Sequence, residues 1–113
     1  MEAKQTRELI DEALKAEAEN ANKWGTTYSS MHEAYAVLKE EVEEAGEELD
    51  EIKRQLTMLW YDVRFCSPSD ADYEVRATET KERAINLVIE ALQIAAVSDK
   101  IVRTWRREHD SNI

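Results

Sequence analysis

The chain has 113 residues and a formal charge of −10, with 25 acidic against 15 basic side chains. This acidity disfavours a nucleic-acid partner, because a phosphate backbone binds to a basic surface. Only two glycines and one proline occur, and apolar residues do not alternate with polar ones. We therefore predict a single all-α domain over residues 1–113.

Cys66 is the only cysteine. It has no partner for an internal disulfide, which favours a reducing, intracellular setting. The first ten residues lack the apolar run of a signal peptide, and no stretch reaches the roughly 18 apolar residues of a membrane-spanning helix. We therefore expect a cytoplasmic protein that does not bind a membrane.

The first predicted helix covers residues 1–23. Its apolar residues form a thin stripe that consists mostly of alanine after Leu14, so we expect this helix to dock on a partner surface or to fray. Turn-forming residues and two aromatic side chains follow over residues 24–29 and separate this helix from the next.

The second predicted helix covers residues 30–65, and Ser30 with Glu33 has the spacing of a capping box at its start. Apolar residues then recur at alternating intervals of three and four, which gives about nine turns of a seam with period 3.5. So long a seam exceeds what one neighbouring helix of a small chain covers. We predict an antiparallel bundle of long helices, completed by a dimer or tetramer. The seam consists of Met31, Tyr35, Leu38, Val42, Ala45, Leu49, Ile52, Leu56, Leu59 and Val63.

The last predicted helical segment covers residues 69–108. Pro68 lies just before it and cannot continue the preceding helix. We expect a short helix over residues 70–76, a kink near Thr78, and then a seam from Ala84 to Trp105 that ends in a polar tail.

A stripe of glutamates lies beside the seam of the second helix, since residues follow one another at about 100°. Uncharged residues precede and follow these glutamates on the same flank, so we expect the flank to be partly buried. Glu40 falls just outside the stripe. The stripe consists of Glu41, Glu44, Glu48 and Glu51.

The last helical segment carries Glu90 and Gln93 on the matching flank. A hairpin that folds at Ser67 sets Glu41 opposite Gln93 and Glu44 opposite Glu90. The two groups of side chains are therefore predicted to face each other. The same register sets Glu48 opposite Asn86, and Glu51 opposite Arg83, which can neutralise it.

Carboxylates on facing flanks repel one another, and burying them unpaired costs several kcal/mol or raises their pKa values. A divalent cation removes this penalty. Carboxylate oxygens together with retained waters suit Mg²⁺ or Mn²⁺, which also bind phosphate oxygens. The alternative is an ordinary solvated acidic face, which is common on helices.

Residues 40–44 read EEVEE and match the pattern EExxE, and residues 90–93 read EALQ, a partial ExxD. These motifs look like those of the MazG-like, all-α nucleoside triphosphate pyrophosphohydrolases. The longer stretches around them, residues 32–48 and 84–102, resemble the shorter MazG-like proteins often found in phages and prophages. The resemblance implies hydrolysis of a (d)NTP to a (d)NMP and pyrophosphate with Mg²⁺, in a dimer or tetramer. It covers about a third of the chain.

The resemblance also implies roles for individual residues. Glu41, Glu44 and Glu90 match the metal ligands. Glu40 matches the leading glutamate, which with Glu41 would serve catalysis by positioning a second metal or a water. Gln93 stands where the family has aspartate, and it offers a carbonyl oxygen but no charge.

Three residues are candidate substrate contacts: Gln93, Asn86 and His32. His32 is also explained as a surface residue at a helix start. Two functions stay open. One is Mg²⁺-dependent nucleotide binding with pyrophosphohydrolysis, and the other is a catalytically inactive phage or prophage protein that sequesters a nucleotide signal or binds a host protein. A purely structural helical bundle is the third alternative.

Overall fold

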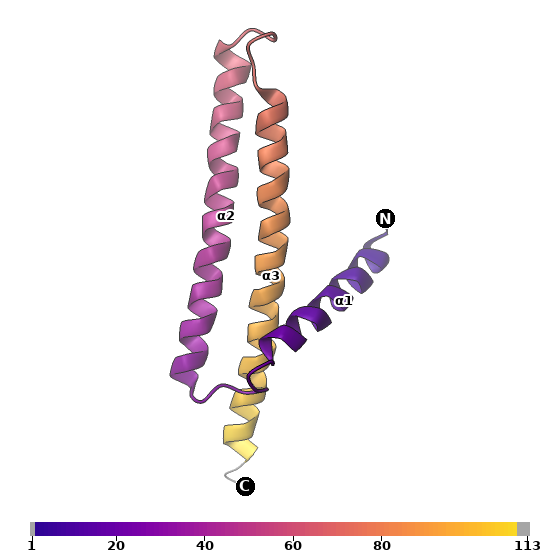
Figure 1. The fold of residues 1–113 in the computed structure, drawn as a ribbon, viewed down its shortest axis with the longest axis vertical. Coiled ribbons are helices and arrows are strands. Elements are labelled where there is room, and N and C mark those ends of the chain that lie inside the picture. Colours follow the sequence, from indigo (N-terminus) through magenta and orange to yellow (C-terminus); the bar gives the residue numbers. More distant parts are fainter. Residues whose placement is uncertain (1, 111–113) are drawn as a thin grey trace. The chain divides into compact units, whose positions relative to one another are not determined.

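The computed structural model describes residues 2–110, and within that range the chain forms three helices and no strand (Figure 1). Helix α1 spans Ala3–Ala21, α2 spans Met31–Phe65 and α3 spans Tyr73–Asp110. The all-α prediction is confirmed, and the predicted bounds of the first two helices agree with the structure to within two residues. None of these helices is both long and apolar enough to cross a membrane.

Helix α2 begins with half of the predicted capping box. The backbone N–H of Glu33 donates to the Ser30 hydroxyl oxygen at 3.1 Å, which satisfies one of the free donors of the first turn. The Glu33 carboxylate accepts its hydrogen bond from the hydroxyl of Ser29. The start of the helix is therefore fixed by two neighbouring serines.

Helix α3 corrects the prediction for the last segment, because it runs from Tyr73 to Asp110 without interruption. The expected short helix over residues 70–76 and the kink near Thr78 are wrong. Residues 67–71 form a turn in which the Ser67 carbonyl accepts from the N–H groups of Asp70 and Ala71, and the Ser67 hydroxyl donates to Asp70. No glycine or proline follows this turn, so nothing interrupts the helix.

The chain divides into two compact units. The first unit comprises the residues up to Val42 and those from Glu90 onward. Its core consists of Tyr28, Ala34 and Val97. The half-buried residues Val37, Leu38 and Ile101 pack against them. This unit therefore has an apolar interior, and whether the whole chain is one domain stays a prediction.

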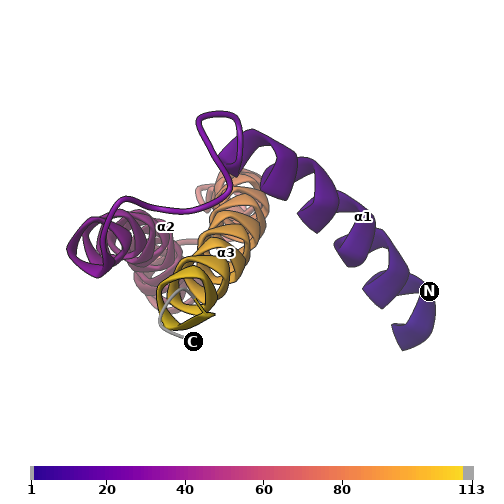
Figure 2. The ribbon, with the colours of Figure 1, turned by 90° about the horizontal axis from the view of Figure 1, so that it is seen from below.

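The connection between α1 and α2 is bound to α3 within the first unit (Figure 2). Gly25 turns the chain with φ of +127°, a conformation that glycine adopts without strain. Lys100 Nζ donates to the Ala21 carbonyl at 2.9 Å, and the Tyr28 N–H donates to the Thr104 hydroxyl at 2.8 Å. Two arginines add further bonds: Arg103 to Thr26 and Asn22, and Arg107 to Thr27 and the Tyr28 carbonyl.

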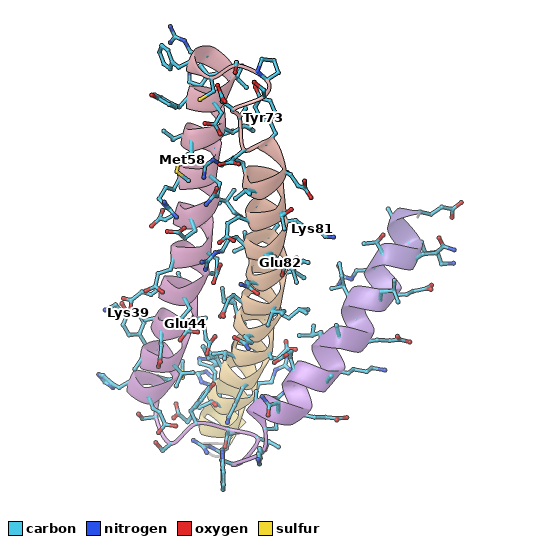
Figure 3. All side chains as sticks on the ribbon, turned by 45° about the horizontal axis from the view of Figure 1, so that its top comes forward. Lys39, Glu44, Met58, Tyr73, Lys81 and Glu82 are labelled. Atoms are coloured by element: carbon cyan, nitrogen blue, oxygen red, sulfur yellow. The ribbon has the colours of Figure 1, made fainter. Side chains whose placement is uncertain are left out.

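The second unit, Glu43–Ile89, is a hairpin in which the end of α2 and the start of α3 run antiparallel (Figure 1). Its buried residues within the described range are Gln55 and Asp62, both polar. Asp62 pairs with Arg76 at 3.2 Å and accepts from the Cys66 thiol at 3.7 Å. Lys81 and Glu82 lie on the side of α3 away from α2 (Figure 3).

The ion pairs of this hairpin differ from the predicted ones. Arg83 binds Glu48 at 3.4 Å and Glu79 at 3.0 Å, whereas Glu51 pairs with Arg54 at 3.0 Å. The hydrogen bond from Arg54 is the main reason why the pKa of Glu51 is lowered, and the charge of Arg83 adds only a smaller contribution. The predicted pairing of Glu51 with Arg83 is therefore wrong, because the Arg83 guanidinium pairs with Glu48 and Glu79 instead.

Candidate metal site

Helix α2 carries Glu41 and Glu44 one turn apart, and α3 carries Glu90. All three side chains are half-buried, and each offers a carboxylate oxygen that lies within 4.8 Å of the other two. Among residues 2–109, whose side chains the structure describes, this is the only group of three or more acidic, histidine or cysteine side chains with such spacing. The three glutamates that the sequence singled out as ligands therefore lie together.

Gln93 completes this group, which we call the carboxylate cluster: Glu41, Glu44, Glu90 and Gln93. With its amide oriented to satisfy its neighbours, Gln93 Nε2 donates to Glu41 Oε2 and to Glu90 Oε2, both at 2.9 Å. Hydrogen bonds to ionised carboxylates are stronger than those between neutral groups. The amide thus holds two carboxylates close together that would otherwise repel each other.

The donor set fits a hard divalent cation. Mg²⁺ takes oxygen ligands at about 2.0–2.1 Å in an octahedron, so two of its ligands lie about 4.2 Å apart at most. Three ligands of one octahedron include at least two neighbouring pairs only about 2.9 Å apart, so the carboxylate oxygens, now within 4.8 Å of one another, must close by up to about 2 Å. Gln93 must also turn its amide, because an N–H group cannot bind a cation and only Oε1 can. Losing its two hydrogen bonds lowers the affinity for the cation.

Tyr28 lies within the electrostatic influence of this cluster, which the sequence did not predict. Burial raises the pKa of the Tyr28 hydroxyl, and the negative charges of Glu33 and Glu41 raise it further, while Arg103 opposes them. Lys100 Nζ lies 4.4 Å from the centre of the Tyr28 ring. Lys100 and Arg103 lie three residues apart and therefore on one face of α3. This pair of basic residues is the sequence signal that could have indicated an aromatic side chain packed against α3.

The other candidate residues lie outside the carboxylate cluster. Glu40 is exposed on α2. His32 is exposed as well and lines a shallow hollow with Met31 and Tyr35. Asn86 is exposed in the second unit. Their roles in catalysis or substrate binding stay predictions.

Cys66 has the environment of an unreactive thiol. Burial is the main cause that raises its pKa, and the nearby charge of Asp62 raises it further. Because the thiolate is the nucleophilic form, a raised pKa lowers reactivity.

No protein-family model, no curated protein and no solved structure matches this chain. The resemblance to MazG-like proteins therefore stays a prediction from the two short motifs. The geometry of the carboxylate cluster is the observation from which a function can be argued.

Proposed function

We propose that this chain is a MazG-like helical protein that binds a nucleotide through Mg²⁺ or Mn²⁺. The observation that supports the proposal is the meeting of three half-buried glutamates, from α2 and α3, within 4.8 Å. Such a group has a strong electrostatic reason to bind a cation, since the cation offsets the mutual repulsion of the carboxylates.

In this proposal Glu41, Glu44 and Glu90 hold the cation. The bound cation would neutralise phosphate charge and polarise a phosphate oxygen. Glu40, on the neighbouring flank of α2, would position a water or a second cation. Gln93 would offer Oε1 to the cation or donate from Nε2 to a phosphate oxygen, while Asn86 and His32 would contact other parts of the substrate.

Hydrolysis of a (d)NTP to a (d)NMP and pyrophosphate is the activity that this proposal includes. One observation favours binding without turnover. Gln93 donates to two of the three carboxylates and adds no charge, so the cluster attracts a cation less strongly than one with aspartate in that place. The second candidate is therefore a catalytically inactive phage or prophage protein. Such a protein would sequester a nucleotide signal or bind a host protein.

The proposal also includes a cytoplasmic homo-oligomer, a dimer or a tetramer. The single cysteine motivates the location. The long apolar seam of α2 motivates the self-association.

Calorimetry with (d)NTPs in the presence of Mg²⁺ tests the proposal. We expect binding that requires the cation and that weakens at least about tenfold in Glu41→Gln. The matched control is Glu43→Gln, which makes the same change in charge on the same helix but at an exposed position. Equal binding by Glu41→Gln and wild type would contradict a nucleotide site at this cluster. No binding at all would contradict a nucleotide ligand and would leave a protein partner.

Pyrophosphate release from the same (d)NTPs separates the two candidates. Release that disappears in Glu41→Gln and persists in Glu43→Gln is the result expected of an enzyme. Nucleotide binding without release supports sequestration. In that case Gln93→Asp, which supplies the missing carboxylate, is expected to tighten Mg²⁺ binding.

A further inference from the structure

Tyr28 carries a hydroxyl group that the chain itself leaves without a hydrogen bond. The residue is only 6 % exposed, and it shares the core of the first unit with Ala34 and Val97. Among residues 2–109 its hydroxyl has no hydrogen-bond partner. Because burying a polar group without a partner is unfavourable, this hydroxyl needs a partner from outside the chain, either a water or a ligand.

The position of Tyr28 is fixed by α3. Its N–H donates to the Thr104 hydroxyl at 2.8 Å, and its carbonyl accepts from Arg107 at 2.9 Å. Lys100 Nζ lies 4.4 Å from the centre of the ring, which is within the range of a cation–π contact. The hydroxyl is therefore held in place before a ligand arrives, and a donor that is fixed in advance loses little entropy on binding.

Part of the carboxylate cluster lies one helical turn from the core that contains Tyr28. On α2, Val37 packs against this core, and Glu41 follows four residues later. On α3, Val97 belongs to the core, and Gln93 precedes it by four residues. Gln93 donates to Glu41, so both steps lead in the same direction, each by about 6 Å. The tyrosine and these two residues are therefore neighbouring layers of the first unit.

The charges that act on the hydroxyl agree with this placement. Burial is the main cause that raises the pKa of Tyr28, and the charges of Glu33 and Glu41 raise it further, while Arg103 lowers it. Because such effects weaken with distance, the hydroxyl lies near the Glu41 carboxylate, although it does not donate to it. Next to the cluster there is thus a neutral donor that no carboxylate uses.

We propose that the Tyr28 hydroxyl donates a hydrogen bond to a phosphate oxygen of the nucleotide bound through the cation at the carboxylate cluster. This inference rests on the proposed function. A cation held by the cluster would bind the phosphate chain and so bring an acceptor close to the fixed donor. The charge of Arg103, which also acts on this hydroxyl, favours an anionic partner. Tyr28 would position the substrate without binding the cation itself.

Calorimetry with two kinds of ligand separates this inference from the proposed function. Mn²⁺ alone probes the carboxylate cluster, whereas a (d)NTP or inorganic pyrophosphate added with Mn²⁺ probes the phosphate contact. Tyr28→Phe removes only the hydroxyl. Tyr61→Phe is the matched control, because Tyr61 is 59 % exposed and belongs to the second unit.

We expect Tyr28→Phe to bind Mn²⁺ alone as wild type does. With Mn²⁺ present it should bind the (d)NTP and pyrophosphate at least about tenfold more weakly, because a hydrogen bond to a charged group is lost. Its melting temperature without ligand should not fall, since the hydroxyl has no partner within the described part of the chain. Tyr61→Phe should match wild type in all of these measurements.

Equal (d)NTP binding by Tyr28→Phe and wild type would overturn this inference and leave the proposed function standing. A loss with the (d)NTP but not with pyrophosphate would overturn the assignment to phosphate. Weaker binding of Mn²⁺ alone or a lower melting temperature in Tyr28→Phe would mean that the hydroxyl supports the cluster or the fold, which would also overturn it. Absence of (d)NTP binding by wild type would reject the proposed function together with this inference.

Discussion

The two units of this chain bury opposite kinds of side chain. The first unit encloses Tyr28, Ala34 and Val97 in an apolar core, and its connecting loop is bound by polar side chains of α3. The second unit encloses Gln55 and Asp62 and leaves its large apolar residues in water. Helices α2 and α3 therefore enclose an apolar core in the first unit and polar side chains in the second.

The comparison teaches that the length of a helix does not define what stabilises it. In the first unit, residues far apart in sequence bury the side chain of Tyr28. Apolar burial and hydrogen bonds therefore both stabilise this unit. In the second unit, ion pairs fix the register of the hairpin, and such pairs give specificity more than stability. The second unit should therefore depend more on its charged groups than the first unit does.

The largest effect is expected for the ion pair inside the second unit. Arg76→Met leaves the Asp62 carboxylate, which is 6 % exposed, without its cation. Because an uncompensated buried charge is costly, we expect the free energy of unfolding to fall by about 2–4 kcal/mol. Denaturant titration measures it. Arg7→Met is the control, because its pair with Asp11 is exposed and is expected to contribute less than about 0.5 kcal/mol. Equal effects of both changes would remove the contrast between the units.

A somewhat smaller loss is expected in the first unit at Thr104. Thr104→Val keeps the shape of the side chain but leaves the buried N–H of Tyr28 without its acceptor. An unsatisfied buried donor costs about 1–3 kcal/mol, which thermal unfolding can measure. Thr57→Val is the matched control, since its hydroxyl is exposed and donates only to the Lys53 carbonyl of its own helix. A loss at Thr104 no larger than that at Thr57 would contradict the role given to the loop contacts.

Gly46 provides a gain rather than a loss. It lies within α2 in the second unit, and a Cβ atom added there meets no atom within 4 Å. Gly46→Ala should therefore raise the free energy of unfolding by about 0.5–1 kcal/mol, as expected from helix propensity. Lower stability of Gly46→Ala would mean that another backbone approaches Gly46 closely.

The smallest effect is expected in the pH dependence. The pKa of Tyr28 is raised in the folded chain, chiefly by burial and then by the charges of Glu33 and Glu41. The neutral hydroxyl is thus favoured by folding. Its contribution is complete below the ordinary pKa of about 10 and is lost as the pH rises through the higher folded value. Denaturant titrations between pH 9 and 11 should show a steeper fall in stability for wild type than for Tyr28→Phe. Identical pH dependence of stability in wild type and Tyr28→Phe would mean that the Tyr28 hydroxyl is exposed to water.

Much of the fold follows from local pattern in the sequence. Ser30 and the break at Pro68 predicted the bounds of α2, because capping and proline chemistry act over a few residues. The kink near Thr78 was predicted wrongly, since a threonine without glycine or proline beside it is compatible with a straight helix. The loop contacts could not be predicted, because Lys100 and Thr104 lie more than 70 residues from the groups that they bind.

Helical periodicity and the hairpin register predicted which side chains meet in the carboxylate cluster. The register placed Glu41 against Gln93, and the structure has Gln93 donating to Glu41. The flank expected to be partly buried is the inner side of the hairpin, and the apolar seam is largely outside it. Periodicity shows which residues share a face, but it does not show which of these faces the neighbouring helix covers.

Electron paramagnetic resonance of Mn²⁺ tests the central claim most directly, because bound Mn²⁺ loses the sharp six-line signal of the free ion. We expect the wild-type chain to bind Mn²⁺ in a saturable way, and Glu90→Gln to bind it at least about tenfold more weakly. The control Glu82→Gln, an exposed position of the same helix, should bind as wild type does. A free Mn²⁺ signal unchanged by the wild-type chain, or equal binding by Glu90→Gln, would contradict a cation site at the carboxylate cluster.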